Sequence, residues 1–440
     1  MKVSILLFKF SLITIFASNY AIFTNPIYQH DKQVQNQILI NKIFKQGIKT
    51  VLIHKKGWEL SFPIIDLNNK EEKIKLSFDE LGNNINNYSW QIIHCNMDWT
   101  QSELEPIEYL SGFFDGDIQE YSLSKNTTYN YINYHIDFPN DNVSFEKSGN
   151  YIIKIFEQNN PSQVVLTKRF YIIDKKVHVK GNIFRQPLKN KTNNQRVNFT
   201  ISYNNNEISD PYSNLLTTII KNEQSLISTK NISPSKTGIN ELAFENIEEL
   251  AFPGGNEFRH FDIKSLRYLS DMLEKIDYKD DSYNVILRPD ISKSNVEYNF
   301  KNDLNGKRLI KLENSDRSNI EADYCKVIFR LNTPLNLNNG NYYVYGSLSN
   351  WETSDTYKMT FDELKQQYTV TLILKQGYYN YQYIFKSEGL AIDKINQWFS
   401  MEGNYYQTEN DYVILTYYKN PSELSEELVG FVKINSISNQ

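Results

Sequence analysis

The feature that most constrains the fold is a run of alternating aromatic and β-branched residues within Asn341–Lys386. Every second residue of Tyr368–Leu374 is apolar, and the alternation returns in Tyr379–Phe385, after Gln376–Gly377. A period of two built from these residue types is typical of half-buried antiparallel strands. Because glycine tolerates positive φ angles, Gln376–Gly377 predicts a turn between the two strands. The run therefore predicts part of a β-sandwich.

Alternation of the same kind recurs along most of the chain. It occurs in Ile74–Phe78, Tyr88–Ile92, Ile132–Phe138, Val197–Tyr203, Leu242–Phe244, Val296–Phe300 and Cys325–Leu331. We therefore predict an all-β protein of three tandem immunoglobulin-like or early-set β-sandwich domains. The predicted domains span residues 22–175, 176–322 and 323–420, and a polar tail follows at 421–440. Apolar residues at helical spacing predict one short helix at 264–276.

Charge and the amino terminus narrow the class of protein further. The chain has 440 residues and a formal net charge of −5. Its net charge therefore does not favour binding to nucleic acid, which is itself negatively charged. Lys2 precedes an interrupted apolar run that ends at Phe16, and small residues follow as far as Ala21. This pattern predicts a signal peptide at residues 1–21. No later segment approaches the roughly 18 apolar residues of a spanning helix, so we predict secretion without a membrane span.

The sequence contains no recognisable catalytic set. Its six histidines are scattered without a pair at metal-ligand spacing, and no nucleophile elbow or phosphate-binding loop occurs. His94–Cys95 lacks an accompanying base signature, and Asp115–Asp117 fits an acidic turn better than a calcium loop. The two cysteines, Cys95 and Cys325, are predicted to be buried free thiols. We predict no enzymatic activity, no cofactor and no metal site.

A long insertion, Cys95–Asp117, is the first candidate for contact with a partner. It carries Trp99, Phe113 and Phe114 among acidic residues. Aromatic residues with a polar rim resemble a protein interface, although the same rings could also lie folded under the loop. Loops on a rigid sheet often hold binding residues, so we take these three aromatic residues as candidates.

The second candidate is the glycine-containing segment that ends at Asp262. Its two glycines allow backbone conformations closed to other residues, and its polar side chains are Asn256, Glu257, Arg259 and Asp262. Glu257, Arg259 and Asp262 are predicted to form a small charge network. The network could lock a turn or contact a partner, and the sequence leaves both open.

The segment Tyr343–Lys386 resembles the glycogen-binding module of the AMP-activated kinase β subunit and related early-set domains. The matching parts are Val344–Trp351, Met359 and Leu372–Phe385. In those modules the tryptophan that corresponds to Trp351 stacks on a sugar. The resemblance implies a secreted glycan-binding protein as one alternative, with Trp351 as the glycan contact. A residue that packs a corner of the sandwich is the other interpretation of Trp351.

A wider resemblance covers most of residues 26–440. The motifs that carry it are Trp90–Trp99, Tyr109–Phe113, Phe252–Arg259, Phe261–Asp262, Ser265–Tyr268, Asn302–Arg308, Leu374–Tyr381 and Thr408–Tyr412. In this order they resemble the plug protein family of the type IX secretion system of Bacteroidota. The resemblance implies a periplasmic protein at the inner side of the outer membrane. There it would bind the translocon barrel and close its periplasmic opening, since a barrel of that size encloses an aqueous channel.

Overall fold

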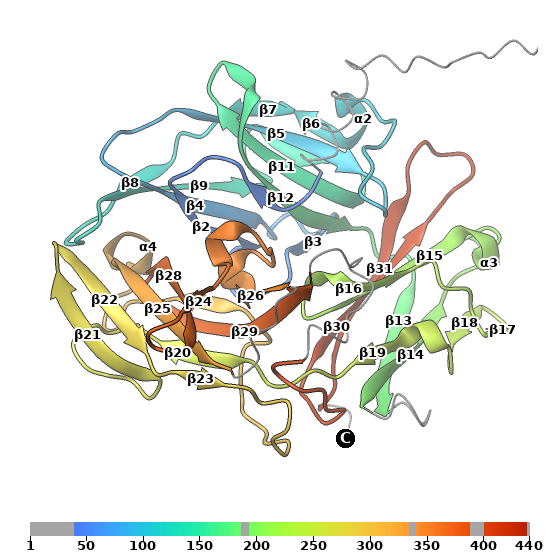
Figure 1. The fold of residues 1–440 in the computed structure, drawn as a ribbon. Helices are drawn as coiled ribbons and strands as arrows, with labels where there is room; N and C mark the ends of the chain where they lie inside the picture. The colour runs from blue at the N-terminus through green and yellow to red at the C-terminus, as the bar shows by residue number, and fades with distance from the viewer. Residues whose placement is uncertain (1–38, 186–192, 334–339, 388–399, 438–440) are drawn as a thin grey trace, which may run out of the picture. The chain divides into compact units, whose positions relative to one another are not determined.

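The computed structural model describes residues 39–185, 193–333, 340–387 and 400–437. The signal peptide predicted at residues 1–21 lies outside the described residues. The regular secondary structure of the described chain is almost all β-strand, in sheets whose pairings are mostly antiparallel, and its helices are single turns (Figure 1). None of the helices among the described residues has the length and apolar character needed to cross a lipid bilayer. The predicted all-β class is confirmed.

The amino-terminal sandwich packs two sheets around one aromatic and aliphatic core. One sheet contains β1 (Lys42–Ile43), β12 (Asn160–Ile173), β11 (Gly149–Glu157), β5 (Tyr88–Cys95) and β7 (Asp115–Asp117), with β3 (Ile64–Asp66) beside β12. The other contains β2 (Ile48–Lys55), β4 (Ile74–Leu81), β9 (Tyr131–Phe138) and β8 (Tyr121–Leu123). A small ribbon of β6 (Leu110–Gly112) and β10 (Val143–Phe145) follows the one-turn helix α2 (Pro106–Tyr109). Trp90 packs edge-on to Phe138 between the two sheets, as the alternation in both strands predicts.

The middle sandwich takes strands from two distant parts of the chain. Its first sheet contains β13 (His178–Arg185), β14 (Asn194–Ser202), β18 (Glu241–Phe244) and β17 (Lys236–Gly238), with β19 (Ala251–Pro253) beside β14. Its second contains β16 (Gln224–Lys230), β15 (Leu215–Lys221), β30 (Asp411–Tyr418) and β31 (Glu427–Asn435). The single-turn helices α3 (Pro211–Asn214) and η1 (Glu248–Leu250) connect these strands. The last two strands of the described residues, β30 and β31, therefore share a sheet with β15 and β16, and the paired residues Leu215 and Tyr418 are 203 positions apart.

The third sandwich is likewise assembled across the predicted boundary at residue 322. One sheet contains β20 (Arg259–Asp262), β29 (Gly377–Ser387) and β24 (Arg308–Ile310), with β26 (Gly340–Tyr345) beside β29. The other contains β21 (Leu273–Lys279), β22 (Ser282–Leu287), β25 (Tyr324–Asn332), β28 (Gln367–Lys375) and β27 (Thr360–Asp362), with β23 (Asp290–Ile291) beside β25. The short helices α4 (Ser318–Glu321), η2 (Ser347–Ser349) and η3 (Asp355–Tyr357) lie in its connections. The domain boundaries stay a prediction, but segments on both sides of residue 322 share these sheets.

The turn predicted at Gln376–Gly377 lies where the chain passes from one sheet to the other. β28 and β29 belong to different sheets, so they form no hairpin with each other. Gly377 is required for a reason other than the predicted positive φ. A Cβ atom at this position would lie 2.3 Å from the carbonyl oxygen of Leu309, so only glycine allows this close approach.

Three local predictions differ from the structure. The helix predicted at 264–276 is wrong, because Leu273 already begins β21 and Leu269 is exposed. No strand forms at Val296–Phe300, although β31 does form within the predicted tail. In each case, contacts with other segments of the chain override the preference of a short local pattern.

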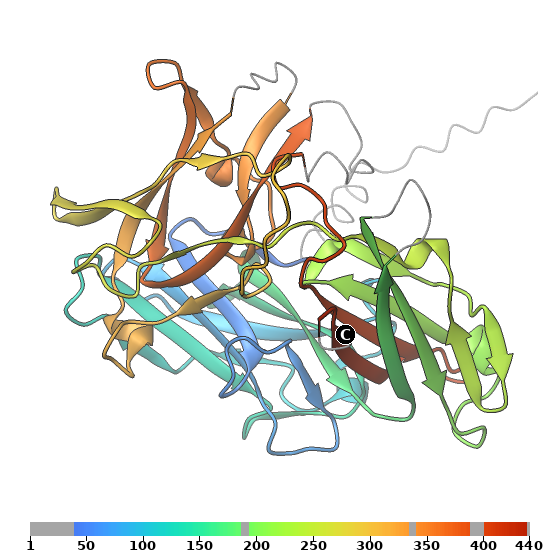
Figure 2. The same cartoon turned by 90° about the horizontal axis from the view of Figure 1, so that it is seen from below.

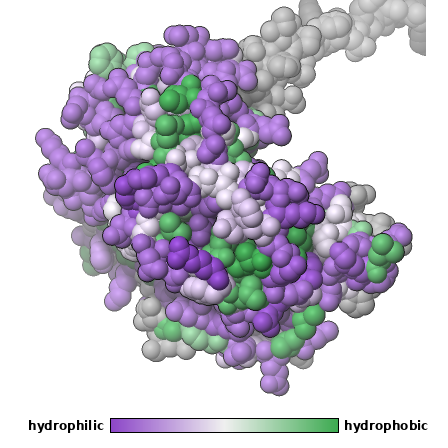
Figure 3. Space-filling view, turned by 90° about the vertical axis from the view of Figure 1, so that its left-hand side faces the viewer, coloured by the Kyte–Doolittle hydropathy of each residue, from purple (hydrophilic) through white to green (hydrophobic). Residues whose placement is uncertain are grey.

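The amino-terminal and middle sandwiches pack together face to face. The buried cluster between them takes Ile152 and Tyr171 from one sheet and Val413 and Leu415 from the other. Figure 2 shows the dark red strands β30 and β31 between the green strands of the middle sandwich and the strands of the first. Both faces of β11 and β30 are therefore buried, which explains their nearly continuous apolar sequences. The face in Figure 3 is mostly hydrophilic, with hydrophobic residues gathered near its middle.

Candidate functional site

The segment between β19 and β20 packs against the chain around Glu402–Thr408. A Cβ atom at Gly254 would lie 2.0 Å from the carbonyl oxygen of Tyr405, so the backbones approach each other closely there. Asn256 donates through Nδ2 to the carbonyl oxygen of Glu402 at 2.7 Å. These contacts place the candidate segment inside the protein and not on its surface.

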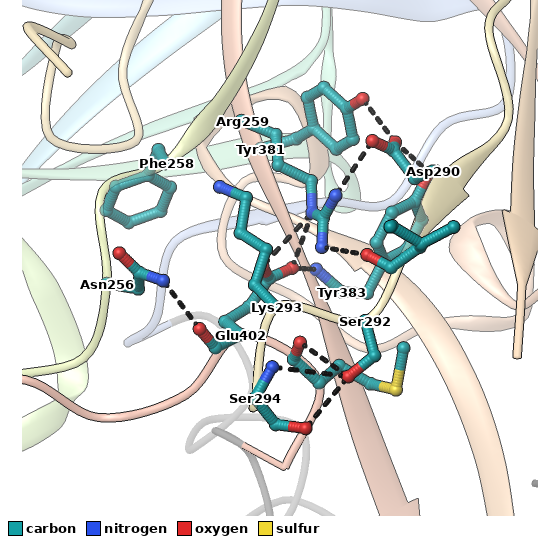
Figure 4. A network of polar contacts seen from close by, with 12 residues as sticks. Asn256, Phe258, Arg259, Asp290, Ser292, Lys293, Ser294, Tyr381, Tyr383 and Glu402 are labelled. Carbon is teal, nitrogen blue, oxygen red and sulfur yellow. Dashed lines mark hydrogen bonds and ion pairs between the residues drawn. The ribbon is translucent and has the colours of Figure 1, made fainter. Parts of the chain in front are cut away.

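Arg259 is the centre of a buried polar network (Figure 4). Its Nε donates to both carboxylate oxygens of Glu402 at 2.9 and 3.0 Å, and its Nη1 donates to Oδ1 of Asp290 at 2.8 Å. The second oxygen of Asp290 accepts hydrogen bonds from the hydroxyls of Tyr381 and Tyr383 at 2.6 and 2.9 Å. Burial acts to lower the pKa of Arg259, but Glu402 and Asp290 outweigh it and raise this pKa. The guanidinium is therefore charged and matched by carboxylates in the core.

The predicted charge network among Glu257, Arg259 and Asp262 is therefore wrong, because Arg259 pairs with Asp290 and Glu402 instead. Asp262 is partly exposed and pairs with Lys264 at 3.1 Å. Glu257 accepts hydrogen bonds from the hydroxyl of Tyr298 and has no ion pair with Arg259. The sequence could not identify Asp290 and Glu402 as the partners, because they lie 31 and 143 residues away from Arg259.

Trp99 lies folded under the insertion and is not presented at its surface, which is the second of the two arrangements that the sequence allows. Only 9% of the residue is exposed, and the guanidinium of Arg169 lies 4.1 Å from the ring centroid. The edge of Tyr171 completes its surroundings. A cation over an aromatic face contributes roughly 0.5–2 kcal/mol. Trp99 therefore stabilises the base of the insertion.

Trp99 also lines a cavity of about 320 Å³, together with Trp351. Trp351 is half-buried and packs edge-on to Phe258 and Tyr345. The cations among the lining residues are Lys168, Arg169, Lys230, Lys307 and Arg308. The packing of Trp351 against two rings fits its interpretation as a corner residue, and its role as a glycan contact stays a prediction.

The tip of the insertion is the exposed part of the candidate region. Phe113 and Phe114 are 65% and 46% exposed, and Ile107 on α2 is 86% exposed. The backbone beneath them is fixed, because the N–H of Phe113 donates to the carbonyl oxygen of Asn142 at 2.9 Å and the carbonyl of Phe114 accepts from Ile92 at 3.1 Å. A rigid backbone therefore presents apolar side chains to the solvent, which is the arrangement of a contact surface.

Comparison with known proteins identifies the family. Residues 48–174 match the model of the type 9 secretion system plug protein first domain. A hypothetical protein from Parabacteroides merdae, known from a crystal structure, is 32% identical and has a TM-score of 0.83; the alignment covers 90% of this chain and 99% of that chain. The chain belongs to the plug protein family of the type IX secretion system. This plug-family chain therefore has a plug-like role in type IX secretion, and its family indicates a periplasmic location and interaction with a component of that system.

Other comparisons add little to this identification. The BSP domain of a biofilm associated protein aligns over 90% of the plug-family chain and 61% of its own length, with 8% identity and a TM-score of 0.17. A likeness at that level carries no argument about fold. No protein with curated annotation matches the chain.

Proposed function

We propose that this protein binds the translocon barrel of the type IX secretion system and closes its periplasmic opening at the inner side of the outer membrane. The match of residues 48–174 to the plug family is the observation that carries the proposal. An unoccupied wide barrel would leak, so its closure needs a rigid body. Two sheets of this protein join segments far apart in the sequence, through the pairing of β15 with β30 and of β20 with β29. These long-range pairings support such rigidity.

The proposed role is mechanical and not enzymatic. The strongest polar network, around Arg259, is buried and its charges are matched, as expected of a structural element. Catalytic groups need access to a substrate and a pKa suited to proton transfer. The family and the all-β fold support a role in which surface and shape are used.

The proposed contact surface is the tip of the insertion, formed by Ile107, Phe113 and Phe114. It lies within the segment that matches the family model. Acidic residues adjoin it in the chain, since Glu105 and Glu108 form the capping box of α2 and Asp115 and Asp117 lie on β7. An apolar centre with a charged rim is typical of protein interfaces. Asn256, Glu257 and Arg259 are half-buried or buried, so in this proposal they support the fold, and Asp262 is left as a weaker contact candidate.

The test is co-purification from native outer membranes. A tagged wild-type copy should recover the translocon barrel, and a Phe113→Ser, Phe114→Ser double variant should recover at least about tenfold less, because two apolar anchors of roughly 1–2 kcal/mol each weaken binding by more than one factor of ten. Leu364→Ser is the matched control, since Leu364 is 97% exposed on a distant turn. Absence of the barrel from wild-type preparations in every secretion state would refute the proposed role. Equal recovery by the double variant would refute only the proposed surface.

A further inference from the structure

Three carboxylates meet at a place that the Arg259 network does not include. One oxygen each from Glu257, Asp303 and Glu409 lies within 4.8 Å of the other two. Glu257 precedes β20, Asp303 precedes β24, and Glu409 precedes β30. Each residue therefore comes from a different segment of the chain, and β30 belongs to a different sheet from the other two strands.

The carboxylates are held in place by donors that do not neutralise them. Both oxygens of Asp303 accept backbone N–H groups, from Phe258 and Asn305, at 2.5 Å. Glu257 accepts from the hydroxyl of Tyr298 at 2.5 Å and from the N–H of Glu409 at 3.0 Å. These neutral donors fix the geometry of the cluster but bring no positive charge into contact with it.

No lysine or arginine among the described residues forms an ion pair with any of the three carboxylates. Three lysines in the neighbourhood donate to other groups, and the first of them, Lys221, donates to the carbonyl oxygens of Pro253 and Gly254 at 2.6 and 2.7 Å. Lys293 donates to the backbone carbonyl of Glu257 at 3.2 Å, and Lys433 pairs with Asp411 at 2.7 Å. Glu257 is only 2% exposed, yet its Oε2 has no hydrogen-bond partner. A buried carboxylate oxygen without a donor is costly and therefore points to a missing positive group.

A fourth side chain supplies independent evidence for a ligand. Asn305 is 5% exposed, and its carboxamide points into the cluster, with Nδ2 3.1 Å from both carboxylate oxygens of Glu409. Its Oδ1 is buried and accepts no hydrogen bond. Two residues of the cluster, Asn305 and Glu257, thus each carry a buried oxygen acceptor without a donor.

We propose that Glu257, Asp303, Asn305 and Glu409 form a binding site for one calcium ion. Hard oxygen ligands suit Ca²⁺ over zinc or copper, and ligands on opposite sides of a calcium ion lie about 4.6–5.2 Å apart. Mg²⁺ requires shorter distances and a stricter octahedron. The sequence predicts no metal site here, because the four ligands are spread over 150 residues.

The ion would fasten the middle sandwich to the third. Glu409 leads directly into β30, and the other three ligands lead into β20 and β24. A cation shared by these segments would oppose their separation, so its removal is expected to loosen this junction and leave the separate sheets intact.

Glu257→Gln gives a sharp test, because the amide retains Oε1 as an acceptor and replaces the unpartnered Oε2 by an N–H donor. Calorimetric titration of calcium-stripped wild type should detect one Ca²⁺ per chain, and millimolar Ca²⁺ should raise Tm by about 2–5 °C. In the presence of a chelator, the Tm of the Glu257→Gln variant should equal or exceed that of the wild type, because the substitution removes a buried unpaired charge. Addition of Ca²⁺ should not raise the Tm of the same variant.

Asp316→Asn is the matched control, because Asp316 is fully exposed and lies outside the cluster. It should bind and respond to calcium like the wild type. Wild type that binds no Ca²⁺ at millimolar concentration, or a Glu257→Gln variant that binds as tightly as wild type, would overturn the site. Binding of Mg²⁺ in preference to Ca²⁺ would overturn the assignment to calcium.

Discussion

The ammonium nitrogen of Lys375 lies 2.6 Å from Oδ2 of Asp79, and both side chains are buried. Asp79 lies on β4 of the first sandwich, whereas Lys375 ends β28 of the third. The hydroxyl of Tyr324 donates to the same oxygen at 2.7 Å, and Asn133 donates to Oδ1 at 2.7 Å. Burial lowers the pKa of Lys375, and Asp79 opposes that shift. One buried ion pair, between residues that are 296 positions apart in the sequence, therefore joins the first and third sandwiches.

Replacing Lys375 by Met should lower the free energy of unfolding by about 3–5 kcal/mol, because the change leaves Asp79 buried without its cation. Denaturant unfolding measures this loss. Adding Asp79→Asn should recover part of it, whereas strictly additive losses would contradict the pairing. Lys365→Met is the control, because the pair of Lys365 with Asp362 is exposed and should leave stability unchanged.

Arg259→Lys should destabilise the third sandwich although it retains the charge. Lysine cannot bond Glu402, Asp290 and the carbonyl of Ile291 at once, as the guanidinium does. We expect a loss of about 2–4 kcal/mol in unfolding free energy and a change in the near-ultraviolet circular dichroism of the surrounding tyrosines. Arg317→Lys, at an exposed position, is the control. A lysine variant as stable as wild type would show that the network contributes little.

Stability should fall in mild acid because of His94. Its Nδ1 lies 2.9 Å from the hydroxyl of Ser102, and burial lowers the pKa of His94 to about 4. Below its ordinary value of roughly 6.5, the unfolded chain binds a proton that the folded chain resists. The contribution of His94 to the free energy of unfolding is therefore fully present above pH 6.5. It falls by about 3 kcal/mol between pH 6.5 and pH 4 and does not change further below pH 4. Unfolding of wild type at each pH measures the decline.

A His94→Gln variant should lose less stability than wild type over the same pH range, because it lacks this titration. His178→Gln, at an exposed position on β13, should follow the wild-type profile. Parallel profiles for wild type and His94→Gln would assign the acid sensitivity to other groups.

Neither cysteine should react in the native protein. Cys95 and Cys325 are free and buried, as the sequence predicts. Burial raises the pKa of the Cys95 thiol to about 12 and also raises that of Cys325. Because the thiolate is the reactive form, a thiol reagent at pH 8 should modify neither residue until denaturant is added, when both should react. Rapid modification of either thiol in the native state would contradict their burial.

Much of the fold could be predicted from the sequence, since the alternation in Ile74–Phe78 and Cys325–Leu331 matches buried positions on β4 and β25. The sequence pattern could not predict, however, that Phe113 is exposed and Trp99 is buried. Both are aromatic residues in one irregular insertion, and no periodicity distinguishes the side that faces the protein. Their difference arises from Arg169 and Tyr171, which come from β12.

Local sequence patterns were enough to predict most of the strands, the all-β class, the family and the buried thiols. Tertiary structure alone decided which strands share a sheet, that β30 completes a sheet with β15, and that Glu257 meets Asp303 and Glu409 instead of Arg259. The physical reason is the range of the interactions. Alternation records the burial of each side chain against its own sheet, which is a local property. Sheet pairing and buried charge contacts join residues far apart in the chain, and local periodicity carries no information about such partners.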